Sequence, residues 1–208
     1  MKTLQKENIN NVTFEALAQT LNVEPAAIHA VHQVESASGN GFLPDGRPLA
    51  LFEGHIFWHQ LKKQGINPEP LQSQHPDIIF PQLNVKTYKR GALEYDRINR
   101  ACAIHRQAAL LSTSWGAFQI MGFNHKLCGF DSVYTYVASM YQSQENQFRA
   151  FITFLQNTGL DIPLREKRWT DFARKYNGPK YKENKYDERL EKAYNQAKER
   201  NLTQKDAT

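Results

Sequence analysis

The sequence predicts a mainly α-helical fold with a small β element, an α+β arrangement. Three observations support this: most segments carry apolar residues at helical spacing, residues 39–46 are crowded with glycine, proline and aspartate, and a single long stretch breaks the helical pattern. The 208 residues, 40% hydrophobic and 23% charged, exclude a wholly disordered chain. We expect one domain over residues 1–208.

The predicted helices begin at recognisable start signals. Thr13 precedes one apolar-periodic run, and Pro25 stands at a first helical position before a second run that ends near Ala37. Asp131 and Ser143 are the predicted N-caps of two later helices. The further predicted helices cover residues 56–63, 91–111, 133–141, 144–156, 169–176 and 187–200.

Two segments depart from this pattern. The turn signal Pro44-Asp45-Gly46 lies between two short apolar pieces, Phe42–Leu43 and Leu49–Phe52, and predicts a small β-hairpin. Residues 65–83 contain four prolines and should be irregular. In the aromatic-rich run SWGAFQIMGF, three apolar side chains are expected to belong to a helix and to pack in the protein core: Phe118, Ile120 and Met121.

The formal net charge of +5 arises near the C-terminus. Residues 1–163 hold 13 basic and 13 acidic side chains, whereas residues 164–208 hold 13 and 8. Clustered cations attract nucleic acid, anionic membrane or an acidic wall polymer alike. A basic helix over about 183–200 could therefore bind anionic outer-membrane lipid, although we favour a terminal helix docked on the domain. No nucleic-acid-binding motif is present, so we expect no nucleic-acid partner.

Cysteine content and hydropathy narrow the class of protein further. Two cysteines do not make a disulfide framework, and no His/Cys cluster has zinc-ligand spacing, so no metal site is predicted. No run approaches 18 apolar residues, and the start MKTLQKENINNV has no apolar core of a secretory signal. We expect a chain made in the cytosol without its own anchor.

Carboxylates supply the strongest signals for chemistry. Glu35 stands at the end of an apolar helix, where apolar walls can raise the pKa of a glutamate toward that of a general acid; an exposed helix-terminal glutamate is the alternative. Glu53 lies among large apolar residues and is costly to bury unless neutral, paired or functional. Asp45 is a third candidate, with an ordinary turn aspartate as its alternative. One acid and one carboxylate are the minimum for glycoside hydrolysis.

Two further segments could line a cleft for sugar rings. The run from Ser114 to Gly122 combines glycines, aromatic faces and the amide of Gln119. In the run ending Tyr176-Asn177-Gly178, the tyrosine could line a cleft and donate a hydrogen bond, although a simple helix end is the alternative.

Taken in order, these segments resemble a known superfamily. A helix ending in Glu35-Ser36, a Gly-x-x-Gln-Ile turn over 116–120 and a Tyr-Asn-Gly element over 176–178 resemble goose-type lysozymes and lytic transglycosylases. The runs ESASGNGFLPDGRPLALFEGHIFW and TSWGAFQIMGFNH more closely resemble the phage and prophage N-acetylmuramidase family, the catalytic domain of many Gram-negative phage endolysins. The similarity extends over roughly residues 10–200.

The resemblance implies a lysozyme-like helical fold and cleavage of the β-1,4 bond between N-acetylmuramic acid and N-acetylglucosamine in peptidoglycan. Glu35 matches the catalytic acid, and Glu53 a second acidic position that we assign as base. Substrate-cleft residues are expected to be Gln119, Tyr176 and Asn177, with Ser114 and Asp45 as further candidates. No cofactor is implied.

The resemblance also implies a setting. An endolysin accumulates in the host cytoplasm, needs a holin to reach the periplasm and wall, and is expected to be a monomer. The superfamily offers no match between about residues 62 and 107, so this segment is predicted to be an inserted lobe that grips the wall.

Two alternatives stay open. A lytic transglycosylase would use one glutamate and leave 1,6-anhydro ends; Pro179, where that pattern usually has glycine, weakens this assignment. A non-catalytic wall-binding module would leave Glu35 merely structural.

Overall fold

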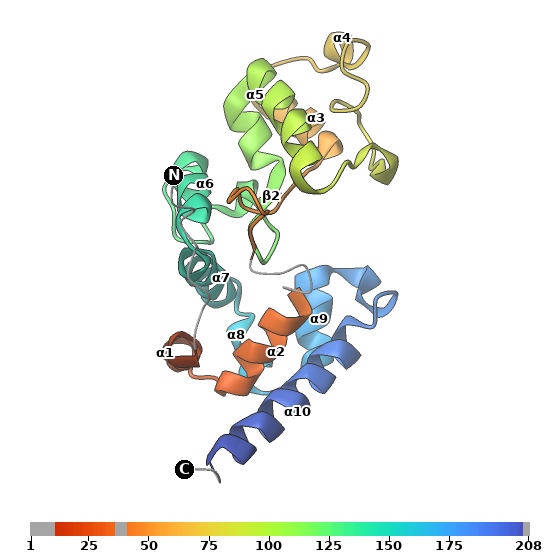
Figure 1. Ribbon diagram of the computed structural model, residues 1–208. Coiled ribbons are helices and arrows are strands. Elements are labelled where there is room, and N and C mark those ends of the chain that lie inside the picture. The colour runs from red at the N-terminus through yellow and green to blue at the C-terminus, as the bar shows by residue number, and fades with distance from the viewer. Residues whose placement is uncertain (1–10, 36–40, 206–208) are drawn as a thin grey trace.

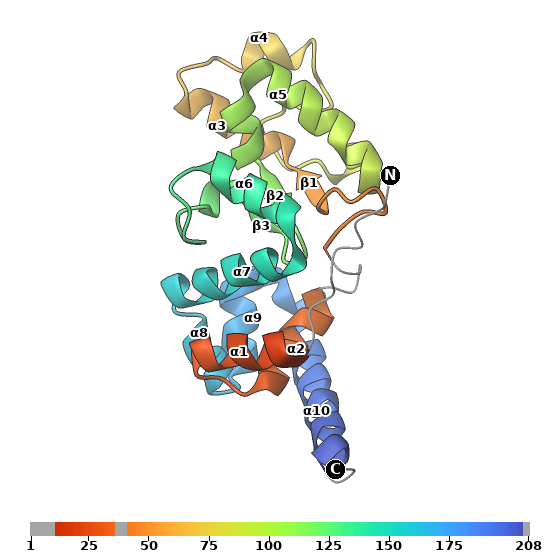
Figure 2. The same cartoon turned by 60° about the vertical axis from the view of Figure 1, so that its left-hand side comes forward.

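In the computed structural model, residues 11–35 and 41–205 are described, and they form two groups of helices with a small sheet between them (Figure 1, Figure 2). The α-helices are α1 (Asn11–Leu21), α2 (Pro25–Glu35), α3 (Gly54–Lys63), α4 (Glu69–Gln72), α5 (Glu94–Leu111), α6 (Val133–Gln142), α7 (Gln144–Thr158), α8 (Asp161–Arg165), α9 (Trp169–Asn177) and α10 (Tyr186–Lys205). The 3₁₀ turns are η2 (Val85–Thr87), η3 (Gly91–Leu93), η4 (Gly122–Asn124) and η5 (Pro179–Lys182), and the strands are β1 (Ala50–Phe52), β2 (Thr113–Trp115) and β3 (Ile120–Met121).

The first lobe, α3 to α5, stands at the top of Figure 1, and the second lobe, formed by α1, α2 and α8 to α10, lies at the bottom. Helices α6 and α7 bridge them, because α6 packs against α5 and α7 packs against α1 and α8. A single cluster of buried apolar side chains continues through both lobes. The mainly α-helical prediction is confirmed.

Two of the four predicted helix starts are confirmed, whereas the start predicted at Thr13 is wrong because α1 already begins at Asn11. Pro25 is the first residue of α2, and the Ser143 hydroxyl caps α7 by accepting a hydrogen bond from the Asn146 backbone N–H at 3.1 Å. The predicted cap at Asp131 is wrong, because Ser132, one residue later, accepts the N–H bond that begins α6. Helix α2 ends at Glu35, and its predicted extension toward residue 37 lies outside the described residues.

The proline-rich segment 65–83 is less irregular than predicted. It contains α4, with Pro68 as its N-cap and Pro70 in its first turn. Proline is tolerated there because first-turn N–H groups have no partner within the helix. The segment predicted as a helix from residue 91 begins with η3 and has a kink at His105 (φ −156°, ψ 100°).

The sheet is antiparallel in the order β1-β2-β3. The predicted hairpin is reduced to one bridge, between Phe42 and Pro48. Most of its predicted second arm forms β1 instead, which pairs with β2 about sixty residues further along the chain. The prediction of a helix through Phe118 is also wrong: residues 116–119 are the turn between β2 and β3. Phe118 is nevertheless buried, as expected for core.

Helix α10 packs along α2 in the second lobe (Figure 1). The apolar stripe of α10 is buried there and consists of Tyr186, Leu190, Ala193 and Tyr194. Contact between α10 and lipid would therefore have to use its opposite, charged face. In the described part of the chain, no helix has both the length and the apolar character needed to span a membrane.

Candidate active site

Glu35 occupies the last position of α2, where its carboxyl group is largely surrounded by protein. The Tyr186 hydroxyl, from the start of α10, donates a hydrogen bond to Glu35 Oε1. Burial raises the pKa of Glu35 to about 7, although this hydrogen bond and the positive charge of Arg189 both act to lower it. A substantial fraction of the Glu35 carboxyl groups therefore keeps a proton near neutral pH.

Helix α10 supplies the surroundings that hold this carboxyl group. Tyr186 is buried, and Arg189 donates from Nη2 to the Val34 carbonyl at 3.2 Å, which ties α10 to the last turn of α2. Burial and the nearby Glu35 carboxylate raise the pKa of Tyr186, so its hydroxyl keeps its proton and remains a donor.

A cavity of about 230 Å³ opens beside Glu35. It is lined by Glu35, Phe118, Gln119, Ile120, Met121, Asn124, Phe154, Tyr176 and Asn177. The three predicted cleft residues at positions 119, 176 and 177 therefore meet the predicted acid, although they lie more than 80 residues from it along the chain.

Gln119 is held by the β2–β3 turn. Its backbone lies in the left-handed region (φ 46°), which is uncommon for a residue other than glycine. The side-chain amide donates to the Gly116 carbonyl at 2.7 Å, and Oε1 accepts from the Ser114 hydroxyl at 2.9 Å. Ser114 thus supports Gln119 and is not among the lining residues of the cavity.

Tyr176 forms an aromatic wall of the cavity. Its ring stacks on Phe172 and Tyr186, with centroids 5.5 and 6.2 Å apart, and its hydroxyl donates to the Phe118 carbonyl at 3.0 Å. Asn177, at the end of α9, forms a side-chain hydrogen bond with Tyr186. Aromatic faces beside amide groups suit the apolar faces and hydroxyls of a sugar ring.

Gln147, on α7, fixes the chain on both sides of the cavity region. Its Oε1 accepts from the Ala117 N–H at 2.8 Å, and its Nε2 donates to the Met140 carbonyl at 2.9 Å and to the Gly41 carbonyl at 3.4 Å. A Cβ on Gly41 would lie 2.2 Å from Gln147 Oε1. Glycine is required there, both for this approach and for φ +80°.

Glu53 lies between β1 and α3 and is not among the residues that line the Glu35 cavity. Its N–H donates to the Ser112 carbonyl at 2.9 Å, which joins it to the start of β2. The side chain is 17% exposed, and Oε2 accepts a 2.6 Å hydrogen bond from the Tyr88 hydroxyl. The structure thus places the two predicted catalytic carboxylates on different elements, Glu35 at the end of α2 and Glu53 at the start of α3.

Asp45 is exposed on its turn and pairs with Arg47, both side chain to side chain at 2.6 Å and with the Arg47 N–H at 3.0 Å. This pairing lowers the pKa of Asp45. Arg47 in turn lies over the ring of Tyr95, 4.1 Å from its centroid. Asp45 therefore holds its own turn in shape and does not line the Glu35 cavity.

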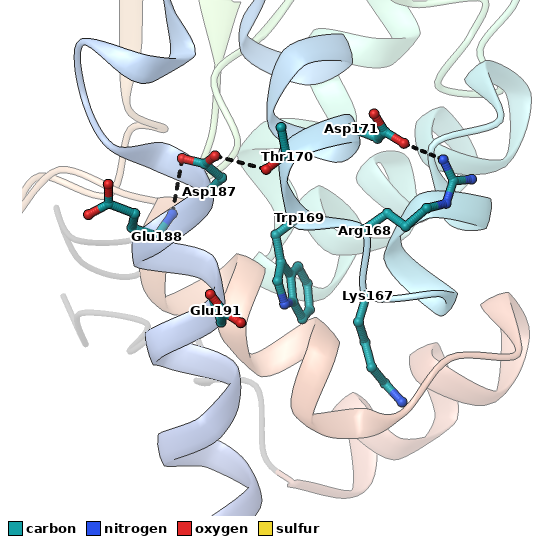
Figure 3. A pocket seen from close by; sticks show the side chains of 8 residues that line it. All are labelled: Lys167, Arg168, Trp169, Thr170, Asp171, Asp187, Glu188 and Glu191. Atoms are coloured by element: carbon teal, nitrogen blue, oxygen red, sulfur yellow. Dashed lines mark hydrogen bonds and ion pairs between the residues drawn. The ribbon is translucent and has the colours of Figure 1, made fainter.

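A second hollow, of about 410 Å³, lies between the start of α9 and α10 (Figure 3). Two pairs of its polar side chains are hydrogen-bonded to each other: Arg168 bonds to Asp171, and the Thr170 hydroxyl donates to Asp187 at 3.0 Å. The Glu35 cavity is the better candidate for chemistry, because the pKa of the carboxyl group that lines it is raised to about 7. Across the described residues, no three His, Cys, Asp or Glu side chains converge as metal ligands.

The fold and this site define a class of protein. The two-lobed, mainly α-helical fold with a small antiparallel sheet is that of lysozyme-like proteins. Residues 24–198 match the family model described as N-acetylmuramidase, and the chain belongs to that family. This confirms the predicted peptidoglycan-degrading class and peptidoglycan as substrate.

A solved structure gives a particular relative. The crystal structure of the Burkholderia AP3 phage endolysin superposes with a TM-score of 0.84 and 38% sequence identity, over 92% of this chain and 71% of that chain. No curated protein matches the chain significantly.

Several residues of this site were not singled out for chemistry by the sequence. Tyr186 and Arg189 surround Glu35, Tyr88 bonds to Glu53, and Gln147 anchors the chain around the cavity. The only related prediction was that the C-terminal helix docks on the domain, which indicated packing but not the contact with Glu35.

Proposed function

We propose that the protein is an endolysin that hydrolyses the β-1,4 bond between N-acetylmuramic acid and N-acetylglucosamine, with Glu35 as general acid. The observation that carries this proposal is the partly buried Glu35 carboxyl beside a cavity, with its pKa raised to about 7. A general acid works best with a pKa near the operating pH. Family membership and the similarity to a phage endolysin support the same assignment.

In the proposed reaction, the Glu35 proton passes to the oxygen that joins the two sugars, and the bond from that oxygen to the anomeric carbon of N-acetylmuramic acid breaks. A water molecule attacks the anomeric carbon and gives a proton to ionised Glu53. Tyr176 and Asn177 contact the sugar beside Glu35. With this reaction, which uses the carboxyl groups of Glu35 and Glu53, the protein would belong to the glycoside hydrolases.

The proposed setting is lysis of a host cell. The enzyme collects in the cytoplasm until a holin opens the membrane, and then acts on the wall as a monomer. A net charge of +5 favours its approach to anionic wall polymer or to anionic outer-membrane lipid.

The substitution Glu35→Gln tests the proposed acid, because glutamine keeps the shape and removes the transferable proton. We expect the rate of lysis of chloroform-treated Gram-negative cells, followed by turbidity, to fall about 10²–10⁴-fold. Glu183→Gln, an exposed glutamate in the second lobe, is the control and should lyse at the wild-type rate. Near wild-type lysis by the Glu35→Gln protein would refute the assignment.

A lytic transglycosylase is the second candidate, and one observation favours it: among the described residues, Glu35 is the carboxylate that lines the cavity, and Glu53 is not. A transglycosylase closes muramic acid on itself and needs no second carboxylate. In that case Glu53→Gln would keep full activity, whereas the hydrolase proposal expects a large loss.

A further inference from the structure

Glu53 stands at the N-cap of α3, yet its side chain caps no backbone N–H of that helix. The carboxylate instead accepts the Tyr88 hydrogen bond at 2.6 Å, and His55 Nδ1 lies 3.4 Å from the same oxygen. A carboxylate at a helix start commonly caps the helix. Here it is directed to a side chain from a different segment, 35 residues away.

The segment that carries Tyr88 is fixed immediately after it. The backbone N–H groups of Lys89 and Arg90 both donate to Glu94 Oε2, at 2.9 and 3.2 Å. Arg90 has a left-handed backbone (φ 59°, ψ 158°), an unfavourable conformation for arginine. The two hydrogen bonds hold the chain in this conformation, and so fix the direction from which Tyr88 approaches.

The same glutamate belongs to a buried ion pair with Arg97, and neither side chain is exposed to solvent (0% for both). Arg97 Nη2 donates to the Thr87 hydroxyl at 3.3 Å, on the other side of Tyr88. The pair also binds both backbone groups of Phe52. The Phe52 N–H donates to Glu94 Oε1 at 3.2 Å, and the Phe52 carbonyl accepts from Arg97 Nη1 at 3.1 Å.

Phe52 is the residue immediately before Glu53. The buried pair therefore holds the backbone beside both ends of the Tyr88–Glu53 hydrogen bond. An ion pair this deeply buried is costly to desolvate, and apolar residues of similar volume often give equal or greater stability. Its hydrogen bonds to two separate segments give it a second role, which is to set their relative position.

From this arrangement we infer that Tyr88, held by the Glu94–Arg97 pair, is a positioning residue that aims the Glu53 carboxylate at the attacking water; the inference rests on the proposed function of Glu53 as base. Segment 62–107, which was predicted to grip the wall, then has a role in positioning Glu53, because Tyr88, Glu94 and Arg97 all belong to it. Burial and the adjacent Glu53 carboxylate raise the pKa of Tyr88, so its hydroxyl remains a donor.

The test is Tyr88→Phe, which removes the hydroxyl and keeps the ring, made both in the wild-type chain and in the Glu53→Gln chain. With soluble uncross-linked glycan strands, we expect kcat to fall about 10- to 100-fold with KM nearly unchanged, because a small misplacement of a reacting group has effects of this size. In the Glu53→Gln chain, the same change should lower kcat no further. Tyr134→Phe, an exposed tyrosine on α6, is the control.

Thermal unfolding of each variant shows whether it is folded. A purely structural role for Tyr88 would lower stability and reduce kcat by the same factor in both chains, which would overturn the inference. Wild-type kcat for Tyr88→Phe, together with a large loss for Glu53→Gln, would also overturn it and leave the proposed function intact. Full activity of Glu53→Gln itself would instead refute Glu53 as base, and the inference with it.

Discussion

At the scale of single residues, three effects compete at Glu35. Burial raises the pKa of its carboxyl group, whereas the Tyr186 hydroxyl and the Arg189 charge lower it, and burial is the largest of the three. The result, about 7, leaves the group able to give up its proton at neutral pH. Tyr186 therefore orients the Glu35 carboxyl group and limits how high its pKa rises.

Tyr186→Phe should move the pH profile in a defined direction. Removing the hydroxyl removes a hydrogen bond that stabilises the ionised Glu35 carboxylate, so the pKa of Glu35 rises further. The alkaline limb of the kcat profile should shift to higher pH. Tyr194→Phe is the matched control, because Tyr194 lies on the same helix and donates to Glu24 instead. A limb that does not move, or that moves to lower pH, would contradict this account of Glu35.

The same raised pKa makes stability depend on pH. The folded protein binds a proton at Glu35 more tightly than the unfolded chain, so this stability is full below pH 4.5 and is lost as pH rises through about 7. The loss corresponds to about 3 kcal/mol. The free energy of unfolding of Glu35→Gln minus that of the wild type should therefore be larger at pH 8 than at pH 5, as measured by urea unfolding. An equal difference at both pH values would show that Glu35 is not desolvated.

At the scale of elements, local signals predicted helices better than strands. Pro25 and Ser143 act within their own helix, so the sequence alone locates those starts. The pairing of β1 with β2 depends on contacts about sixty residues apart, and no local pattern specifies it. The short turn before β3 differs from the predicted helix because its buried apolar residues have no clear period over so few positions.

The β2–β3 turn positions Gln119 and depends on Gly116. This residue has φ +74°, and a Cβ there would lie 2.8 Å from the Gln147 side-chain carbon Cδ. Gly116→Ala should lower the free energy of unfolding by about 1–3 kcal/mol, measured by urea unfolding. Gly159→Ala is the control for backbone strain alone, because φ there is +67° and no atom lies within 4 Å. Equal losses for the two variants would mean that the contact with Gln147 carries no cost.

At the scale of the whole molecule, the proposed catalytic pair comes from both lobes. Glu35 and its α10 partners belong to the second lobe, and Glu53 with Tyr88 belongs to the first (Figure 1). The sequence predicted that Gln119, Tyr176 and Asn177 lie near Glu35, and the four residues line one cavity. It could not predict Tyr186, Arg189 or the Glu94–Arg97 pair as partners of the two acids, because only folding brings together side chains so far apart in the chain.

Identification of the products released from purified peptidoglycan sacculi tests the central claim most directly. Mass spectrometry before and after borohydride reduction should show muropeptides ending in reducible N-acetylmuramic acid, released about 10²–10⁴-fold more slowly by Glu35→Gln. Such ends require water as the acceptor and cleavage at the muramic acid carbon. Products that end in 1,6-anhydro-muramic acid, or in reducible N-acetylglucosamine, would contradict the account.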